Sequence, residues 1–208
     1  QGFHWTQTYK DQHPTAPLKQ GRAMRDDETT GTSVTFWPDP KIFETTINDF
    51  ETLRSRFQQM AFLNKGLKIT LTDMRETEVQ GDEVTGDGDN AAEELHQTVT
   101  YQYANGIKDY VDYMVKLRKA TPIEPDVIDI ESEDLQIGIS VEIAMQWTTA
   151  YSESVHTFAN TISTTEGGTH EEGFRAALTS MVNRYARDKN ILKEKDDNLS
   201  GDDVREGL

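Results

Sequence analysis

The stretch that most constrains the fold is residues 147–175, where an alternating pattern gives way to two glycines and then to a helix signal. Residues 153–159 alternate with a period near two, which is typical of a strand. Thr169, with Glu172 three residues later, forms a capping-box signature after the glycine pair. Apolar side chains then recur at helical spacing, at Phe174, Leu178, Met181, Val182 and Tyr185. The stretch therefore predicts a strand, a glycine turn and a capped helix in succession.

The rest of the chain carries similar patterns. Alternation predicts strands at residues 2–9, 32–37, 67–71, 99–103, 127–130 and 137–147, and residues 10–30 read as a loop. A capping signature of Asn48 and Glu51 predicts the start of a helix, which should end before Gly66 in a left-handed backbone conformation. Its buried face is expected to consist of Phe50, Leu53, Phe57, Met60 and Ala61. Further helices are predicted from Ile107 and from a cap of Ser200 and Asp203. The expected fold class is α+β, with a domain boundary near Asn105.

Composition limits the classes of function. The 208 residues carry a net charge of −16, which argues against nucleic-acid binding by overall charge alone. Half of that excess lies between Asp73 and Glu94, where there are nine acidic residues and one arginine. We expect residues 73–97 to be a long acidic insertion between two antiparallel strands, and we interpret it as a solvated loop rather than an interaction segment.

Cysteine is absent, which excludes disulfides and cysteine-based zinc sites and favours a cytoplasmic protein. The chain opens at Gln1 without an initiator methionine and stops at Leu208 just after a helix-like segment. We therefore expect an internal fragment of a longer polypeptide. No apolar run approaches the roughly 20 residues that span a bilayer, so no membrane association is expected.

Several blocks together resemble the B-subunit family of bacterial DNA gyrase, the ATP-driven part of a type IIA topoisomerase. They occur in the family's order and cover nearly the whole chain: TGTSVTFWPDP, RFQQMAFLNKGL, VEIAMQW, SVHTFANTI, EGGTHEEGFRAAL and GDDVREGL. The resemblance implies that residues 1–104 are the C-terminal half of an ATPase domain of the type shared with Hsp90, MutL and histidine kinases. It also implies that residues 105–208 form most of a transducer domain resembling the ribosomal S5 domain 2-like fold.

The resemblance also implies roles for individual residues. Thr32, in the TGT block, matches the family threonine that helps to hold adenine, and Val34 matches an apolar wall residue of the same ATP pocket. Arg175, in the GGTHEEGFR block, matches an arginine that faces the cavity through which DNA passes, where it would bind phosphate. The residues that catalyse hydrolysis and bind Mg²⁺ would lie outside this chain. No catalytic or metal-binding residue is therefore assigned, and the chain alone is expected to be inactive.

Simpler interpretations stand beside these roles. Thr32 could be an ordinary strand threonine, and Arg175 could be a solvated residue that pairs with Glu171 or Glu172 at helical spacing. His156 and His170 lack the spacing of a metal site. Ser154 and His156 are expected to be polar neighbours rather than a nucleophile and base, and Gly167–Gly168 a structural turn rather than an anion site.

The resemblance implies a function for the intact protein. With ATP and Mg²⁺, a gyrase B subunit would couple ATP binding and hydrolysis to DNA strand passage and negative supercoiling. Its partners would be double-stranded DNA, a second B subunit that meets it across the ATP gate, and the A subunit of gyrase in an A2B2 heterotetramer. Two alternatives remain, namely the B subunit of topoisomerase IV, which relaxes and decatenates DNA, and a non-catalytic dimerisation module on the same scaffold.

Overall fold

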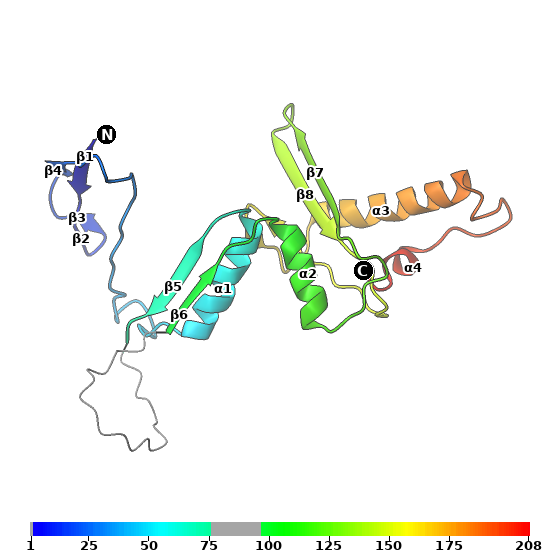
Figure 1. The fold of residues 1–208 in the computed structure, drawn as a ribbon, viewed down its shortest axis with the longest axis horizontal. Coiled ribbons are helices and arrows are strands. Elements are labelled where there is room, and N and C mark those ends of the chain that lie inside the picture. The colour runs from blue at the N-terminus through cyan, green and yellow to red at the C-terminus, as the bar shows by residue number, and fades with distance from the viewer. Residues whose placement is uncertain (1, 76–96) are drawn as a thin grey trace, which may run out of the picture. The chain divides into compact units, whose positions relative to one another are not determined.

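The computed structural model describes residues 2–75 and 97–208. The chain divides into two compact units, Gln1–Ile47 and Asn48–Leu208 (Figure 1). Helices and short antiparallel strands occur together, which confirms the predicted α+β class. Within the described ranges, no helix has both the length and the apolar character needed to cross a membrane.

The first unit consists of two small antiparallel pairs. Strand β1 (Phe3–Thr6) pairs with β4 (Lys19–Ala23), and β2 (Tyr9–Lys10) pairs with β3 (His13–Pro14). The prediction of a loop over residues 10–30 was therefore wrong. Strand β4 reads KQGRA and is exposed along its whole length, so it has no apolar alternation to reveal it. The tight turn at Asp11 and Gln12, both with positive φ, lacks the usual glycine signal.

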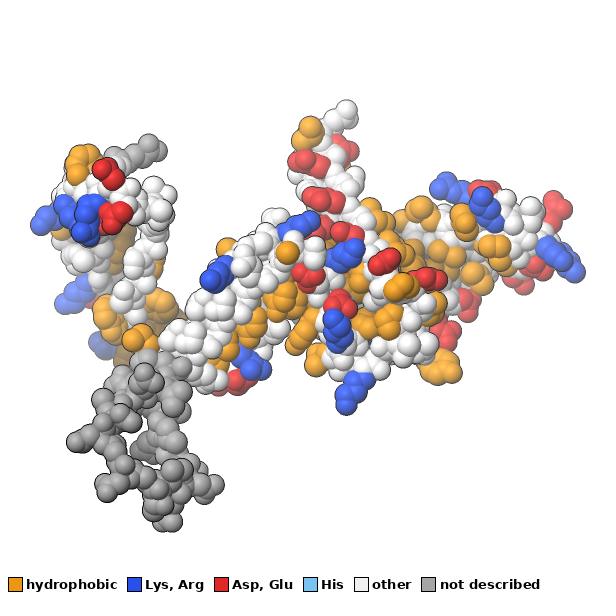
Figure 2. Space-filling view, viewed as in Figure 1, with side chains coloured by type: hydrophobic (Ala, Val, Ile, Leu, Met, Phe, Trp, Pro, Cys, Tyr) orange, Lys and Arg blue, Asp and Glu red, His pale blue; other side chains and the backbone are white. Residues whose placement is uncertain are grey.

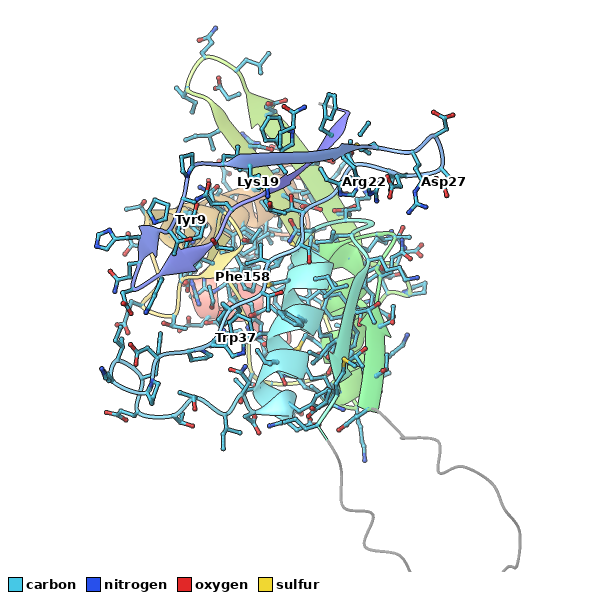
Figure 3. The ribbon with its side chains drawn as sticks, turned by 90° about the vertical axis from the view of Figure 1, so that its left-hand side faces the viewer. Tyr9, Lys19, Arg22, Asp27, Trp37 and Phe158 are labelled. Carbon is cyan, nitrogen blue, oxygen red and sulfur yellow. The ribbon has the colours of Figure 1, made fainter. Side chains whose placement is uncertain are left out.

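The predicted strand at residues 32–37 was also wrong, since residues 31–39 form no helix or strand. A strand needs a neighbour to hydrogen bond with its backbone, and no described segment pairs with this one. Val34 and Trp37 are 78% and 84% exposed, and Trp37 lies on this irregular segment in Figure 3.

In the second unit, helix α1 (Phe50–Leu63) lies against a hairpin of β5 (Ile69–Asp73) and β6 (Gln97–Tyr101) (Figure 1). The pairing of Ile69 with Tyr101 and of Asp73 with Gln97 confirms the antiparallel strands predicted on either side of the acidic insertion. Residues 76–96 of that insertion lie outside the described residues.

The N-cap of α1 is Asp49 and not the predicted Asn48. The Asp49 carboxylate accepts a hydrogen bond from the Thr52 backbone N–H at 2.7 Å, so the capping pattern lies one residue later. Gly66 has the predicted positive φ, at 79°.

The main aromatic core forms where α1 meets helix α2 (Ile107–Leu117). Phe62 is 1% exposed and stacks on Tyr103, with 3.6 Å between ring centroids. Tyr110 and Tyr113 pack beside it at 5.0 and 5.4 Å. The predicted buried stripe was partly wrong, because it omitted Phe62 and included Met60, which is 43% exposed.

The long hairpin consists of β7 (Ile128–Asp134) and β8 (Ile139–Met145), and α2 packs against β8. Residues 131–134 extend β7 beyond the predicted strand, because they are all polar and give no alternation. The strand predicted at residues 153–159 is reduced to β9 (Phe158–Ala159), which pairs with β10 (Ile162–Ser163). Ser154 instead donates its backbone N–H to the Leu208 carbonyl at 2.7 Å.

Helix α3 (Thr169–Asp188) follows the glycine pair, as predicted, but the capping box of Thr169 and Glu172 was wrong. The helix begins one residue earlier than that box requires. The Gly168 carbonyl already accepts the backbone N–H groups of Glu171 and Glu172, and Gly168 is the N-cap. Helix α4 (Gly201–Arg205) has the predicted capping box of Ser200 and Asp203 and packs beside α3 (Figure 1).

Candidate functional site

A groove of about 740 Å³ runs along one face of α3, and α4 and the loop before it form its other side. Four arginines and one glutamate line it, so basic side chains outnumber acidic ones among the lining residues, although the chain as a whole is acidic. The charged residues are Arg175, Arg184, Arg187, Arg205 and Glu172. Lys and Arg side chains are visible along α3 in Figure 2. Such a surface can bind an anionic ligand through guanidinium groups.

Two residues of α3 hold the loop that closes the groove. Arg187 donates to the carbonyls of Lys193 and Asp196 at 3.0 and 2.8 Å and to the Asn198 side chain at 2.7 Å. The buried Asn183 amide bonds to both the backbone N–H and the carbonyl of Leu199. The guanidinium of Arg187 therefore hydrogen bonds within the protein and is not available to a ligand.

Arg175 lies at one side of the groove and contacts two carboxylates. Its Nη1 donates to Glu153 Oε1 at 2.6 Å, and its Nε donates to Glu171 Oε1 at 3.0 Å. The pairing with Glu171 is the helical i,i+4 contact that the sequence allows. Hydrogen bonding to Glu153 raises the pKa of Arg175 above its usual value, so its charge is permanent.

Arg205 is the most enclosed of the four arginines, with 11% of its side chain exposed. Its Nε donates to Glu153 Oε2 at 2.7 Å, and it also pairs with Asp202 at 3.1 Å. The capping box at Ser200 fixes the short helix that carries Arg205. Arg184, in contrast, is exposed, and its side chain has no hydrogen bond or ion pair with any described residue. It is the arginine of the groove most available to a ligand.

Acidification should weaken this ion-pair cluster. Burial raises the pKa of the Glu153 carboxyl, but the hydrogen bonds and charges of Arg175 and Arg205 outweigh burial, so its pKa lies below the usual 4.5. Since the folded pKa is the lower one, the stabilisation is present above pH 4.5 and is lost as the pH falls through the folded value. The protection factors of the amides of Ser154 and α4, which are exchange rates corrected for the intrinsic effect of pH, should therefore fall on acidification. The same acid dependence in Glu153→Gln would contradict this assignment.

Of the three residues suggested by the sequence, Thr32 and Val34 belong to the first unit and Arg175 to the second. Thr32 and Val34 are exposed on the irregular segment of the first unit, and neither lines the α3 groove. Arg175 does line the groove, with Arg184, Arg187 and Arg205, which the sequence reading had not singled out. Spacing does not indicate Arg184 and Arg187, because they lie nine and twelve residues from Arg175, about 180° and 120° further round the helix. No local pattern indicates Glu153, because its partners are 22 and 52 residues away.

A second cavity, of about 1010 Å³, lies between α2 and β8 and includes Ser154 and His156. Ser154 Oγ lies 3.2 Å from His156 Nε2, so the two are hydrogen-bonded neighbours as their spacing suggests. Burial lowers the pKa of His156, and the Tyr110 ring packs edge-on against it at 6.0 Å. Among the described residues, no carboxylate hydrogen bonds to this imidazole to complete a catalytic triad.

Comparisons with known proteins bear on the family and the fold of the chain. The DNA gyrase B family matches residues 106–208. The whole chain is 57% identical to the DNA gyrase B subunit of Streptomyces coelicolor and 56% identical to the novobiocin-sensitive DNA gyrase B subunit of Streptomyces niveus. It spans about 30% of the length of these curated relatives.

Solved structures give the same result. The chain resembles the 43K ATPase domain of Thermus thermophilus gyrase B, solved with an aminocoumarin, with a TM-score of 0.76 and 26% identity. That match covers 99% of this chain and 50% of the other. The fold also resembles that of the gyrase B subunit of Myxococcus xanthus, with a TM-score of 0.66, 19% identity, and coverage of 90% and 48% of the two chains. These matches confirm the fold predicted from the sequence blocks, and the chain belongs to the DNA gyrase B family.

Proposed function

We propose that the chain is part of an ATP-driven type II topoisomerase subunit that couples ATP binding and hydrolysis to DNA strand passage and negative supercoiling. The observation that carries this proposal is identity of 56–57% to gyrase B subunits along the entire chain. The arginine-lined groove supports it, because guanidinium groups bind the phosphates of DNA without regard to sequence. Arg175 is the proposed contact to DNA.

In this proposal residues 1–104 are the C-terminal half of the ATPase domain, and residues 105–208 are most of the transducer domain. The family match that begins at residue 106 supports the boundary. Thr32 and Val34 would contribute to the adenine pocket. Both are exposed here, so neither is enclosed by the described residues. Other parts of the protein would therefore supply the main contacts to ATP and Mg²⁺.

The proposed assembly is a cytoplasmic A2B2 heterotetramer with the A subunit of gyrase. It would act on double-stranded DNA, and its two B subunits would meet across the ATP gate. The test is topoisomer analysis of relaxed plasmid with the full-length subunit together with its cognate A subunit, in the presence and absence of ATP. ATP-dependent negative supercoiling is the expected result. Relaxation or decatenation alone would favour topoisomerase IV, and no ATP-dependent change would favour a non-catalytic module.

Arg175→Ala in the full-length subunit should lower the rate of supercoiling roughly tenfold, the size expected for loss of one hydrogen bond to a charged group. The log–log salt dependence of DNA binding should also become shallower by about one unit if one phosphate contact is lost. Arg54→Ala is the matched control, because Arg54 pairs with Glu51 on the surface of α1 and lies outside the groove. Equal effects of the two substitutions would contradict a DNA contact at Arg175.

A further inference from the structure

One carboxylate joins two arginines that come from separate helices. Each oxygen of Glu153 accepts from a different guanidinium, Oε1 from Arg175 on α3 at 2.6 Å and Oε2 from Arg205 on α4 at 2.7 Å. Both contacts are charge-assisted hydrogen bonds of short length. The Glu153 side chain is only 36% exposed, and those of Arg175 and Arg205 are 28% and 11% exposed. The contacts are therefore less screened than those of a surface ion pair.

The other carboxylates in the cluster cannot link the two helices. Glu171 pairs with Arg175 within α3, and Asp202 pairs with Arg205 within α4. Asp202 is 99% exposed, so its contribution is that of an ordinary surface pair. Among the residues that the structure describes, Glu153 is the carboxylate that contacts both Arg175 and Arg205.

The segment that carries Glu153 also holds α4 and the residues after it. The Thr148 backbone N–H and hydroxyl both donate to the Gly207 carbonyl, at 2.8 and 3.0 Å. The Trp147 indole donates to the Val204 carbonyl at 3.0 Å, and the Ser154 N–H donates to Leu208. A shift of α4 would therefore act on Glu153 through this backbone as well as through Arg205.

We propose that Glu153 is a positioning residue that fixes the guanidinium of Arg175 relative to α4. The placement of Arg175 on the DNA-facing side of the groove then depends on the position of α4. This inference rests on the proposed function, in which Arg175 contacts phosphate. Glu153 itself repels phosphate, so it acts through Arg175. Because Glu153 holds both guanidinium groups, a movement of α4 would be transmitted through Arg205 and Glu153 to the guanidinium of Arg175.

The test uses plasmid DNA and the full-length subunit with its cognate A subunit, and measures the change in linking number per ATP hydrolysed. Glu153→Gln keeps the shape of the side chain and removes its charge, and it should lower this ratio roughly threefold to tenfold. Asp202→Asn is the matched control, since it removes a carboxylate from Arg205 without touching Arg175. The control should retain the wild-type ratio. The double variant Glu153→Gln/Arg175→Ala should be no worse than Arg175→Ala.

The outcomes distinguish the positioning role of Glu153 from the proposed contact between Arg175 and DNA. If Arg175→Ala is impaired and Glu153→Gln is not, the positioning role is overturned while the proposed function stands. Additive losses in the double variant would also overturn it, because a purely structural carboxylate acts independently of Arg175. An unimpaired Arg175→Ala variant would remove the proposed DNA contact and this inference with it. Impairment of both single variants without additivity supports the proposal.

Discussion

Phe62→Ala should lower the free energy of unfolding by about 3–5 kcal/mol, the usual cost of truncating a fully buried phenylalanine. Phe62 is 1% exposed, and its ring stacks on Tyr103 and packs against two further tyrosines from α2. Alanine would leave a cavity between α1, α2 and Tyr103 and would remove these aromatic contacts. Urea denaturation followed by circular dichroism measures the loss.

Phe36→Ala is the control for this experiment, because Phe36 is 72% exposed and its truncation should change stability by less than about 0.5 kcal/mol. A loss at position 62 as small as that expected at position 36 would show that the cluster around Phe62 is not the core of the second unit.

Gly207→Ala should destabilise the attachment of the C-terminal turn by about 3 kcal/mol or more. Gly207 has φ of 79°, a conformation that costs a residue with a Cβ roughly 1–2 kcal/mol. A Cβ there would also lie 2.4 Å from the Thr148 carbonyl oxygen and 2.8 Å from that of Ala150. Since both neighbours are backbone atoms, the turn must move and give up its hydrogen bonds to Thr148 and Ser154.

Hydrogen exchange at the amides of Thr148 and Ser154 reports this local opening directly. Gly138→Ala separates conformational strain from the clash, because Gly138 has a similar φ of 67° but a Cβ at this position would have no atom within 4 Å. It should cost only about 1–2 kcal/mol. If Gly207→Ala leaves hydrogen exchange at Thr148 and Ser154 unchanged, the C-terminal turn is not held by its hydrogen bonds to these two residues.

Local signals explain which parts of this fold could be predicted. The starts of the helices were predicted to within one residue, because apolar spacing and caps such as Ser200 with Asp203 act over a few neighbouring residues. The β5–β6 hairpin was predictable because its strands alternate cleanly. Strand β4 was not, since its exposed polar residues carry no alternation, and residues 32–37 alternate without a partner strand in the described chain.

The candidate site was harder to predict from the sequence than the fold was. Arg175 was identified through the family blocks, and its pairing with Glu171 follows from helical spacing. The contact between Glu153 and Arg205 joins residues 52 positions apart and depends on how α4 packs beside α3. Such tertiary ion pairs have no signature in a single sequence. The same holds for Phe62, whose partners come from α2 and from the residues after β6.

The most direct test of the proposed function is photo-crosslinking from α3 to DNA in the assembled full-length enzyme, with the gate closed by a non-hydrolysable ATP analogue. A photoreactive residue at Ser180, which lines the groove, should crosslink to DNA. The same residue at Tyr185, which is 60% exposed and lies about 140° further round the helix, should not. Crosslinks from position 185 but not from 180, or from neither, would contradict the proposal that the arginine groove faces DNA.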